Sequence, residues 1–519
     1  MRVLRHAPDG TKAIIDNSTG TVVAPAAPEP EPAKIEEPPP PAEPEPNNDD
    51  GDENEQIAEM VADGTDANNA RRLVADHGED LHYVHAWRRW LTWNSTVWAL
   101  DNTGEIQRRA KTTARGILID TLDEVNGNTK DPRLARALRA QSANGIGAMI
   151  ALAQSEPGIP VLPEQLDSDP MLFAMANGVI DLENGHFHDH HRDDLTTKHS
   201  PVAYDVRAHC PIWETFIRWA MGGDDELVLF MQRWCGYTLT GCVDAQVVPF
   251  WHGEGANGKT TAAVTLQRLF GPYSAQLPAD LLLEKRGERH PTEIALLKGA
   301  RLALCSELDE GRPLAEARLK ALSGGDVVTA RRMREDYWEF QPTHKLIVIT
   351  NHQPRVRGQD HALWRRILLV PWTQTVRPEQ QDPRLPEKLA TELPGILNWC
   401  LEGLRAWKDA GLQPPAAVRN ATNKYQEAED SVARWIDETC TRDPQSSESA
   451  SALRRAYLGW AKSNAERAVT DREFGQRLTR AGFDRKHRRD GWHWRGITMI
   501  QPEITFDDLL SPQRGSYDN

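Results

Sequence analysis

Residues Phe250 to Thr261 read FWHGEGANGKTT, and this stretch decides how the rest of the chain is interpreted. Its middle, Gly253 to Thr260, fits G-x-x-x-x-G-K-[ST], the pattern of a loop that cradles phosphates. Glycines let the backbone turn its N–H groups toward a polyphosphate, because no Cβ stands in the way. The lysine then reaches the β and γ phosphates, and the threonine hydroxyl completes the shell of a Mg²⁺ ion. The pattern therefore predicts a site for ATP and Mg²⁺.

The segments on either side of the loop support this prediction. Ala245 to Trp251 is a short apolar run typical of a strand, and Thr260 to Phe270 has the spacing of an amphipathic helix. Strand, glycine loop and helix is the required order, because the helix N-terminus also faces the phosphates. An ordinary glycine turn is the alternative that these flanks disfavour. We expect the whole loop to bind the nucleotide: Gly253, Glu254, Gly255, Ala256, Asn257, Gly258, Lys259, Thr260 and Thr261.

Two further apolar runs end in polar side chains suited to the same chemistry. Ala300 to Leu308 (ARLALCSEL) is a buried-strand pattern in which Glu307, or else Asp309, supplies a carboxylate near the strand end. Such a carboxylate orients the Mg²⁺ shell and the attacking water, so Glu307 joins Thr260 as a predicted metal ligand. A surface acidic turn is the alternative. His344 to Thr350 is a third buried strand, and the amide of the following residue, Asn351, can hold the water.

The composition of the 519-residue chain indicates a cytoplasmic protein with room for roughly two to four domains. It is 39% hydrophobic and 26% charged, and no apolar run is long enough for a membrane span or a signal peptide. The six cysteines contain no C-x-x-C pair, which disfavours a zinc ribbon or a disulfide framework. We therefore expect a reducing environment and no membrane partner.

Negative charge is concentrated in one segment. Between Glu29 and Glu55, eleven acidic residues and one lysine carry −10 of the net charge of −15. This Pro- and Glu-rich segment cannot bury enough apolar surface to fold, so residues 1–65 are predicted to be a mostly disordered acidic tail. The rest of the chain is near charge balance, so the net charge does not exclude a nucleic acid partner.

Residues 66–236 are predicted to form a mixed α+β domain. Aromatic residues near period two, around the turn 94–96, are typical of the apolar face of a small sheet. Interleaved with Arg88 and Arg89, they could instead stack nucleic-acid bases, but core packing is favoured. The carboxylates of Asp167 and Asp169 lie between prolines and are interpreted as a loop, and the histidines between residues 186 and 199 lack metal-site spacing. The aromatic residues are Tyr83, Trp87, Trp90, Trp93 and Trp98.

Five motifs in order carry a resemblance to a known family: GEGANGKTT, SELDEG, LKALSGGDVVTARR, KLIVITNHQP and DHALWRRILLVPW. Together they resemble the ATPase core of superfamily 3 helicases. More narrowly, they are similar to the phage and plasmid primase-helicase family that includes the poxvirus primase-helicase. Residues 171–185, MLFAMANGVIDLENG, resemble the segment that precedes the helicase in that family. The likeness covers roughly residues 66–440, and it implies an AAA+-type phosphate-loop core at 237–405 with a helical extension at 406–440.

The resemblance implies an ATP-hydrolysing DNA helicase that forms a ring, typically a hexamer. It would translocate on single-stranded DNA and unwind duplex DNA during phage or mobile-element replication. Arg366, or alternatively Arg365, would be the arginine finger in the neighbouring subunit's site. Lys320, Arg331 and Arg332 would lie on or near a hairpin that contacts DNA, with salt bridging as the alternative role. Leu308 separates Glu307 from Asp309 in SELDEG, unlike the directly adjacent acids of some relatives, so the choice among Glu307, Asp309 and Glu310 stays open.

The last sizeable block of the chain is basic. Between Arg442 and Arg495, thirteen basic residues face seven acidic ones. Two helical patterns, 451–463 and 471–481, precede a strand-turn-strand pattern whose tip is basic, which predicts a winged-helix-like DNA-binding domain at 441–502 and a tail at 503–519. A merely solvated hairpin is the alternative. The predicted DNA-contacting residues at the tip are Arg485, Lys486, Arg488 and Arg489.

Two other functions remain open at the level of sequence. The family often fuses a primase to this helicase, so a primase-helicase with priming activity is one alternative. A DNA-binding initiator or loader that uses ATP as an assembly switch, without unwinding, is the other. No priming domain is apparent in the sequence, which favours a helicase that works with a separate primase or replication protein.

Overall fold

The computed structural model contains two units, residues 1–63 and 64–519. It describes the strands of the first unit and, in the second, residues 64–284, 291–306, 308, 312–331, 337–356, 360–464, 466 and 468–500. In the first unit three strands pair as an antiparallel sheet: β1 (Arg2–His6), β2 (Lys12–Asp16) and β3 (Val22–Pro25). The rest of the predicted acidic tail lies outside the described residues.

The second unit begins with helices packed on a small sheet. The side chains of Thr65, Asp131 and Ser142 accept hydrogen bonds from the first turns of three of these helices, which fixes where they begin. The helices are α2 (Asp66–His77), α3 (Glu105–Glu124), α4 (Pro132–Ala140) and α5 (Ala143–Ala153). The antiparallel sheet consists of β4 (Leu81–Val84), β5 (Arg89–Trp93) and β6 (Trp98–Leu100).

The aromatic residues of this small sheet divide between the core and the surface. Tyr83, Trp90 and Trp98 are buried, which confirms core packing for these three. Trp87 and Trp93 are only half-buried. The turn that the sequence predicts between β5 and β6 is present, because the Asn94 side-chain oxygen accepts hydrogen bonds from the backbone at 96 and 97.

A connecting region leads to the central sheet. Asp167 accepts a 2.7 Å hydrogen bond from the Thr197 backbone N–H, and Asp169 accepts one from Met171, also at 2.7 Å. These two carboxylates therefore fix the local backbone, as the loop interpretation predicts. The elements of the region are β7 (Leu172–Met175), β8 (Gly178–Asp181), β9 (Phe187–His188), α6 (Pro211–Ala220) and α7 (Asp225–Leu239).

Five parallel strands form the central sheet, in the order β11-β12-β15-β10-β16. Their bounds are β10 (Val248–His252), β11 (Ser274–Leu277), β12 (Leu302–Ser306), β15 (Lys345–Thr350) and β16 (Ile367–Pro371). On β15, Ile347 and Ile349 face one apolar core, while Leu346 and Val348 face the other. A parallel sheet covered on both faces needs such continuous apolar runs. The predicted α/β class is confirmed.

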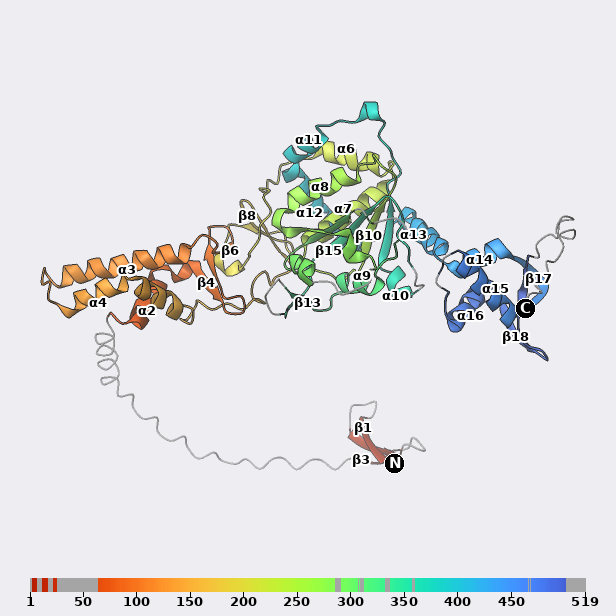
Figure 1. Cartoon of the computed structure of the whole chain (residues 1–519), viewed down its shortest axis with the longest axis horizontal. Coiled ribbons are helices and arrows are strands. Elements are labelled where there is room, and N and C mark those ends of the chain that lie inside the picture. The colour runs from red at the N-terminus through yellow and green to blue at the C-terminus, as the bar shows by residue number, and fades with distance from the viewer. Residues whose placement is uncertain are drawn as a thin grey trace, which may run out of the picture. The chain divides into compact units, whose positions relative to one another are not determined.

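Helices cover both faces of this sheet (Figure 1). One face packs against α6, α7, α8 (Lys259–Phe270), α11 (Leu385–Thr391) and α12 (Leu393–Ala410). The other packs against α9 (Glu316–Leu322), α10 (His361–Trp364) and α13 (Ala416–Ala428). A separate antiparallel hairpin consists of β13 (Val328–Arg331) and β14 (Tyr337–Phe340). Short 3₁₀ helices lie at 78–80, 192–194, 271–273, 279–282, 291–297 and 378–380.

The C-terminal region has a core of its own, built around Trp435, Tyr457 and Phe474. Three helices, α14 (Ser431–Thr439), α15 (Ala450–Ser463) and α16 (Asp471–Arg480), contribute to it. They pack on an antiparallel sheet ordered β17-β19-β18, whose strands are β17 (Cys440–Ser449), β18 (Asp484–Arg488) and β19 (Gly491–Met499). The predicted helices and hairpin are therefore present. In the described residues, no helix is long and apolar enough to cross a membrane.

Candidate nucleotide-binding site

The glycine loop lies at the carboxyl edge of the central sheet. β10 ends at His252, the loop follows, and α8 begins at Lys259, so the predicted order of strand, loop and helix is confirmed. β10 pairs with β15 on one side and β16 on the other. In open α/β sheets, ligands bind at the carboxyl ends of strands, at the point where the strand order reverses. The loop therefore occupies the position where this fold places a ligand.

Two of the three glycines in the loop are sterically required. A Cβ on Gly253 would lie 2.1 Å from the Trp372 carbonyl oxygen. Gly258 has φ +88°, and a Cβ there would lie 2.8 Å from the Phe216 ring. A Cβ on Gly255 would meet nothing within 4 Å, so Gly255 is not required on steric grounds. The loop backbone is therefore packed closely against Trp372, which directly follows β16, and against α6.

Lys259 is folded back onto the loop. Its side chain is only 4% exposed. Nζ donates hydrogen bonds to the carbonyl oxygens of Gly253 (2.6 Å) and Glu254 (3.2 Å) and to Asn257 Oδ1 (2.9 Å). Asn257 Nδ2 donates in turn to the Trp372 carbonyl at 3.1 Å. Burial lowers the pKa of the Lys259 ammonium to about 8, because the charged form loses its hydration.

The outer side of the loop is open to solvent. Glu254, Gly255, Ala256 and Thr260 are exposed, and Thr261 is half-buried. On this side the Val376 N–H donates a 2.9 Å hydrogen bond to the Ala256 carbonyl. A hydroxyl beside a buried lysine and an exposed glycine-rich backbone are the groups that a polyphosphate and Mg²⁺ require. The residues present therefore fit such a ligand.

The ends of three strands meet beside the loop. In the sheet register, His252 lies opposite Thr350, and Ile349 lies opposite Ser306 at the end of β12. Asn351 follows β15 directly and is exposed, as its predicted role requires. The pKa of His252 is lowered by burial and by the positive charges of Lys259 and His352. The predicted acids Glu307, Asp309 and Glu310 lie outside the described residues.

The two candidate arginine fingers lie at the opposite edge of the sheet. Arg366 immediately precedes β16, and its carbonyl accepts a 2.6 Å hydrogen bond from Val248 at the start of β10. Its guanidinium is half-buried and donates to the Ala362 carbonyl (2.6 Å) and to Gln246 Oε1 (3.1 Å). Arg365 is exposed and donates to the same Gln246 oxygen at 3.3 Å. Neither arginine lies near the glycine loop of its own chain.

The predicted DNA-contacting residues are spread over several elements. Lys320 on α9 forms an ion pair with Asp360, the N-cap of α10, so it already has a partner. Arg331 is exposed, with its guanidinium 5.1 Å from the centre of the Tyr337 ring, and Arg332 lies outside the described residues. Of the four basic residues predicted at the hairpin tip, three lie along β18 and Arg489 lies in the turn; all four are exposed, and the Arg485 guanidinium lies 4.5 Å from the Trp492 ring. The structure does not bring these groups together with the loop.

Some site contacts escape sequence reasoning. The Trp372 carbonyl accepts a hydrogen bond from the Asn257 side chain, although the two residues are 115 positions apart in the sequence. The contact between Gln246 and Arg366 spans 120 residues. The only local signal for either is the sequence proximity of Trp372 to β16 and of Gln246 to β10. Neither identifies the contact.

Two family models match the chain. The first, described as D5 N terminal like, matches residues 70–222, and the second, described as a family of unknown function, matches residues 251–366. These matches, together with the viral relatives described below, make the chain similar to D5-like primase-helicases. The D5-like match covers the N-terminal helices, the small sheet and the connecting region as far as α6. The second match begins at the end of β10 and ends at Arg366, so it spans the glycine loop and the strands from β11 to β15.

The viral relatives of this chain are distant and longer. "Putative helicase 022R" of Frog virus 3 (isolate Goorha) is 23% identical over 401 residues, which is 61% of this chain and 41% of the relative. "Putative primase C962R" of African swine fever virus (isolate Tick/Malawi/Lil 20-1/1983) is 23% identical over 333 residues, which is 58% of this chain and 34% of the relative. The chain thus spans well under half the length of these relatives. A solved structure, the A form of the apo NrS-1 C-terminal region, has a TM-score of 0.45 at 10% identity and covers 69% of this chain and 75% of that one.

Proposed function

We propose that this chain is an ATP-dependent DNA helicase that acts in the replication of a phage or another mobile element. The observation that carries the proposal is the buried Lys259 ammonium, held by three acceptors of a glycine loop at the carboxyl edge of a parallel sheet. A lysine so placed is suited to exchange those acceptors for the oxygens of a polyphosphate. The names of the relatives, helicase and primase, favour DNA as the second ligand.

Each part of the loop has a role in this proposal. The backbone N–H groups at the start of α8 face the phosphates, and Lys259 reaches the β and γ phosphates. The exposed Thr260 hydroxyl and a carboxylate after β12, Glu307 or Asp309, would hold Mg²⁺. When bound, Mg²⁺ neutralises charge that develops on the phosphates. Asn351 orients the attacking water from the neighbouring strand end.

The same proposal requires more than one copy of the chain. Arg366, or Arg365, acts on the nucleotide of a neighbouring protomer, since both lie at the amino edge of the sheet. An arginine supplied in this way is worth about 10³ to 10⁵ in turnover. Identical head-to-tail contacts close into a ring when the rotation permits it. A hexamer is the form that the family resemblance favours.

The C-terminal region is proposed to be a winged-helix-like DNA-binding domain. Its elements follow the order helix, strand, helix, helix, strand, strand. β18 and the turn after it present four exposed cations, Arg485, Lys486, Arg488 and Arg489, to solvent. Cations on an exposed tip are suited to phosphate contacts, which position a protein on DNA without reading sequence.

A strand-displacement assay on substrates with a 3′ or a 5′ overhang tests the proposed activity. ATP and Mg²⁺ should drive release of the labelled strand from one of the two substrates. Lys259→Ala should abolish release and ATP hydrolysis while leaving DNA binding intact. ATP-dependent assembly on DNA with no released strand would instead favour an initiator or loader.

Priming is a separate question, because one of the relatives is named a primase. The test is incorporation of labelled ribonucleotides on a single-stranded template. Products from this chain alone would favour the primase-helicase alternative. Unwinding without such products would favour a helicase that works with a separate primase.

A further inference from the structure

A deep groove separates the small N-terminal sheet from the hairpin of β13 and β14. It has a volume of about 1260 Å³. One wall contains Trp87 and Arg88 of the turn between β4 and β5 and Arg89 at the start of β5, and the other contains Tyr337 and Trp338 of β14. The floor includes the 3₁₀ segment at 291–297 and Lys298. Aromatic rings therefore face one hollow from two different parts of the fold.

The cations of this groove suit a phosphate backbone. Arg88 and Arg89 are exposed and form no ion pair with any residue in the described part of the chain. Lys298 Nζ lies 4.2 Å from the centre of the Trp87 ring and 5.3 Å from that of Trp338, so it spans both walls. Together with Lys198, these residues give four cations against three carboxylates in the lining: Glu164, Asp167 and Glu339.

The turn that presents the two arginines is strained. Arg88 has φ +53°, in the left-handed region that non-glycine residues seldom adopt. Two short hydrogen-bonded turns hold it there, with Trp87 N–H donating to the Val84 carbonyl and Arg88 N–H to that of His85, both at 3.1 Å. Backbone outliers of this kind concentrate at ligand-binding positions. The strained residue therefore lies between the Trp87 ring and the second arginine, Arg89.

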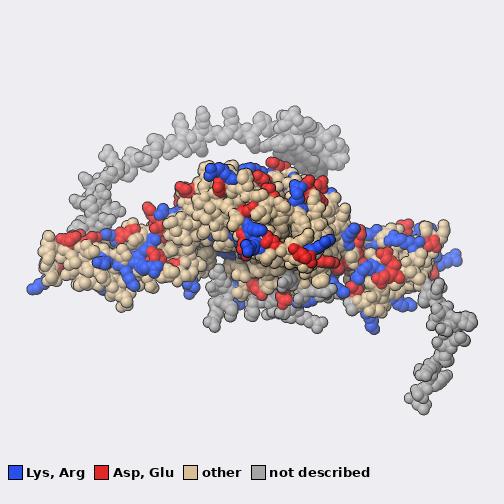
Figure 2. Space-filling model, turned by 90° about the horizontal axis from the view of Figure 1, so that it is seen from above, with Lys and Arg blue, Asp and Glu red and all other residues tan. Residues whose placement is uncertain are grey.

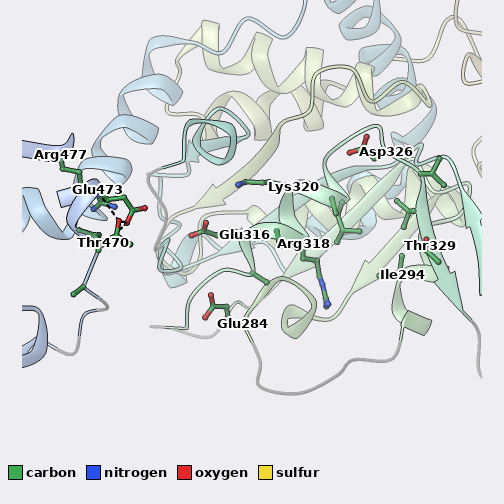
Figure 3. A pocket seen from close by; sticks show the side chains of 18 residues that line it. Glu284, Ile294, Glu316, Arg318, Lys320, Asp326, Thr329, Thr470, Glu473 and Arg477 are labelled. Atoms are coloured by element: carbon green, nitrogen blue, oxygen red, sulfur yellow. Dashed lines mark hydrogen bonds between the residues drawn. The ribbon is translucent and has the colours of Figure 1, made fainter. Parts of the chain in front are cut away.

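A second hollow, of about 1050 Å³, has the opposite balance (Figure 3). Its lining contains four carboxylates and three cations. Two of those cations are committed elsewhere, since Lys320 pairs with Asp360 and Arg477 lies 3.0 Å from Asp430. On the face drawn in Figure 2, basic and acidic side chains are intermixed, so no broad basic field selects a path there. The groove beside Trp87 is therefore the better candidate for a polyanion.

We propose that this groove holds a single strand of DNA, with bases stacked against Trp87 and Tyr337 and phosphates contacted by Arg88 and Arg89. Tyr337 is 63% exposed and offers a ring to a base. Aromatic rings combined with cations are the general means by which proteins bind single strands without sequence preference. This inference rests on the proposed function, and it names a contact from the D5-like N-terminal region for the strand on which the helicase moves.

The test measures binding of the full-length protein to a fluorescent oligo-dT strand over a range of salt concentrations, without ATP. The double variant Arg88→Gln/Arg89→Gln should lower the salt slope by about 1.4, because each single-strand phosphate contact contributes about 0.7. For each tenfold decrease in salt concentration, the affinity of the wild type should therefore rise about 25-fold more than that of the double variant. Trp87→Ala should weaken binding about fivefold or more, and Trp87→Phe, which keeps a ring, should retain most of the affinity.

A matched control is Lys111→Gln/Arg115→Gln on α3, which removes the same charge. Both residues are exposed, and neither forms an ion pair with a described residue. This variant should bind oligo-dT within about twofold of the wild type. Equal losses in the control and in Arg88→Gln/Arg89→Gln would overturn the proposal, as would an equal loss of affinity for a blunt duplex. If the wild type hydrolyses no ATP but the groove variants still bind oligo-dT more weakly than the wild type, the proposal that the groove binds a single strand is supported and the helicase proposal fails.

Discussion

Lys259 should make ATP binding depend on pH in a range where an ordinary lysine stays charged. Burial lowers the pKa of Lys259 to about 8 in the free protein. Phosphate oxygens within hydrogen-bond reach favour the ammonium, so the bound nucleotide raises that pKa again. At a pH above the pKa of Lys259 in the free protein, ATP binding is therefore coupled to the uptake of a proton. The affinity must fall as the pH rises through that pKa.

The size of the effect follows from the fraction of free protein that carries the charge. With a pKa of about 8, that fraction is about 0.9 at pH 7 and about 0.1 at pH 9. Affinity should then fall about tenfold across this interval. A solvated lysine has a pKa of about 10.4 and would remain almost fully charged, which predicts a flat profile. The phosphate of the ligand titrates near pH 6, outside this interval.

The assay is equilibrium binding of a fluorescent ATP analogue with saturating Mg²⁺ at constant ionic strength. Lys259→Arg is the matched variant, because a guanidinium keeps its charge throughout the range. It should bind more weakly at pH 7, since its planar group does not match the three loop acceptors, but its profile should be flat. A flat wild-type profile would refute the reasoning, and so would a tenfold fall that persists in Lys259→Arg.

Three further outcomes are expected. Gly253→Ala places a methyl group against the Trp372 carbonyl, so it should lower the free energy of unfolding in urea by about 1 to 3 kcal/mol and also weaken ATP binding. Gly255→Ala should change the free energy of unfolding by no more than about 0.5 kcal/mol. Inactive Lys259→Ala and Arg366→Ala proteins should recover part of the ATPase activity when mixed, and full turnover by Arg366→Ala alone would show that this arginine is not the finger. Neutralising the four cations of β18 and its turn should lower the salt slope for duplex DNA by up to about 3.6 and leave DNA-independent ATP hydrolysis unchanged. An unchanged slope would show that these cations do not contact DNA. The four residues are Arg485, Lys486, Arg488 and Arg489.

Local patterns predicted the secondary structure around the glycine loop, because the three elements are contiguous in the sequence. A strand, a glycine loop and a helix follow one another within residues 245–270, so apolar spacing and glycine positions suffice to place them. The same holds for Asn351, which follows directly from the end of a buried strand. Gly255 shows the limit, because the motif leaves position 255 open and only the packing reveals which Cβ would collide.

Contacts between distant segments could not be predicted in this way. The period-two aromatics around 83–98 indicated a packed sheet, which is correct for Tyr83, Trp90 and Trp98. Trp87 belongs to the same pattern but lies in a turn, beside Lys298 from more than two hundred residues away. Spacing along the chain carries no information about that approach, so the groove emerges only from the fold.

The two ends of β10 impose a further requirement on the proposed mechanism. β10 and β16 are parallel and paired from Val248 and Ile367 to His252 and Pro371, so the glycine loop and Arg366 lie at opposite ends of the same two strands. Five residues of strand span about 16 Å, which separates Arg366 from any phosphate on its own loop. An arginine on this edge can act on a nucleotide only if the edge of one protomer faces the loop of another. Because Arg366 would then have to release Gln246 and the Ala362 carbonyl, while Arg365 is already exposed, the mixing experiment should be run with Arg365→Ala as well.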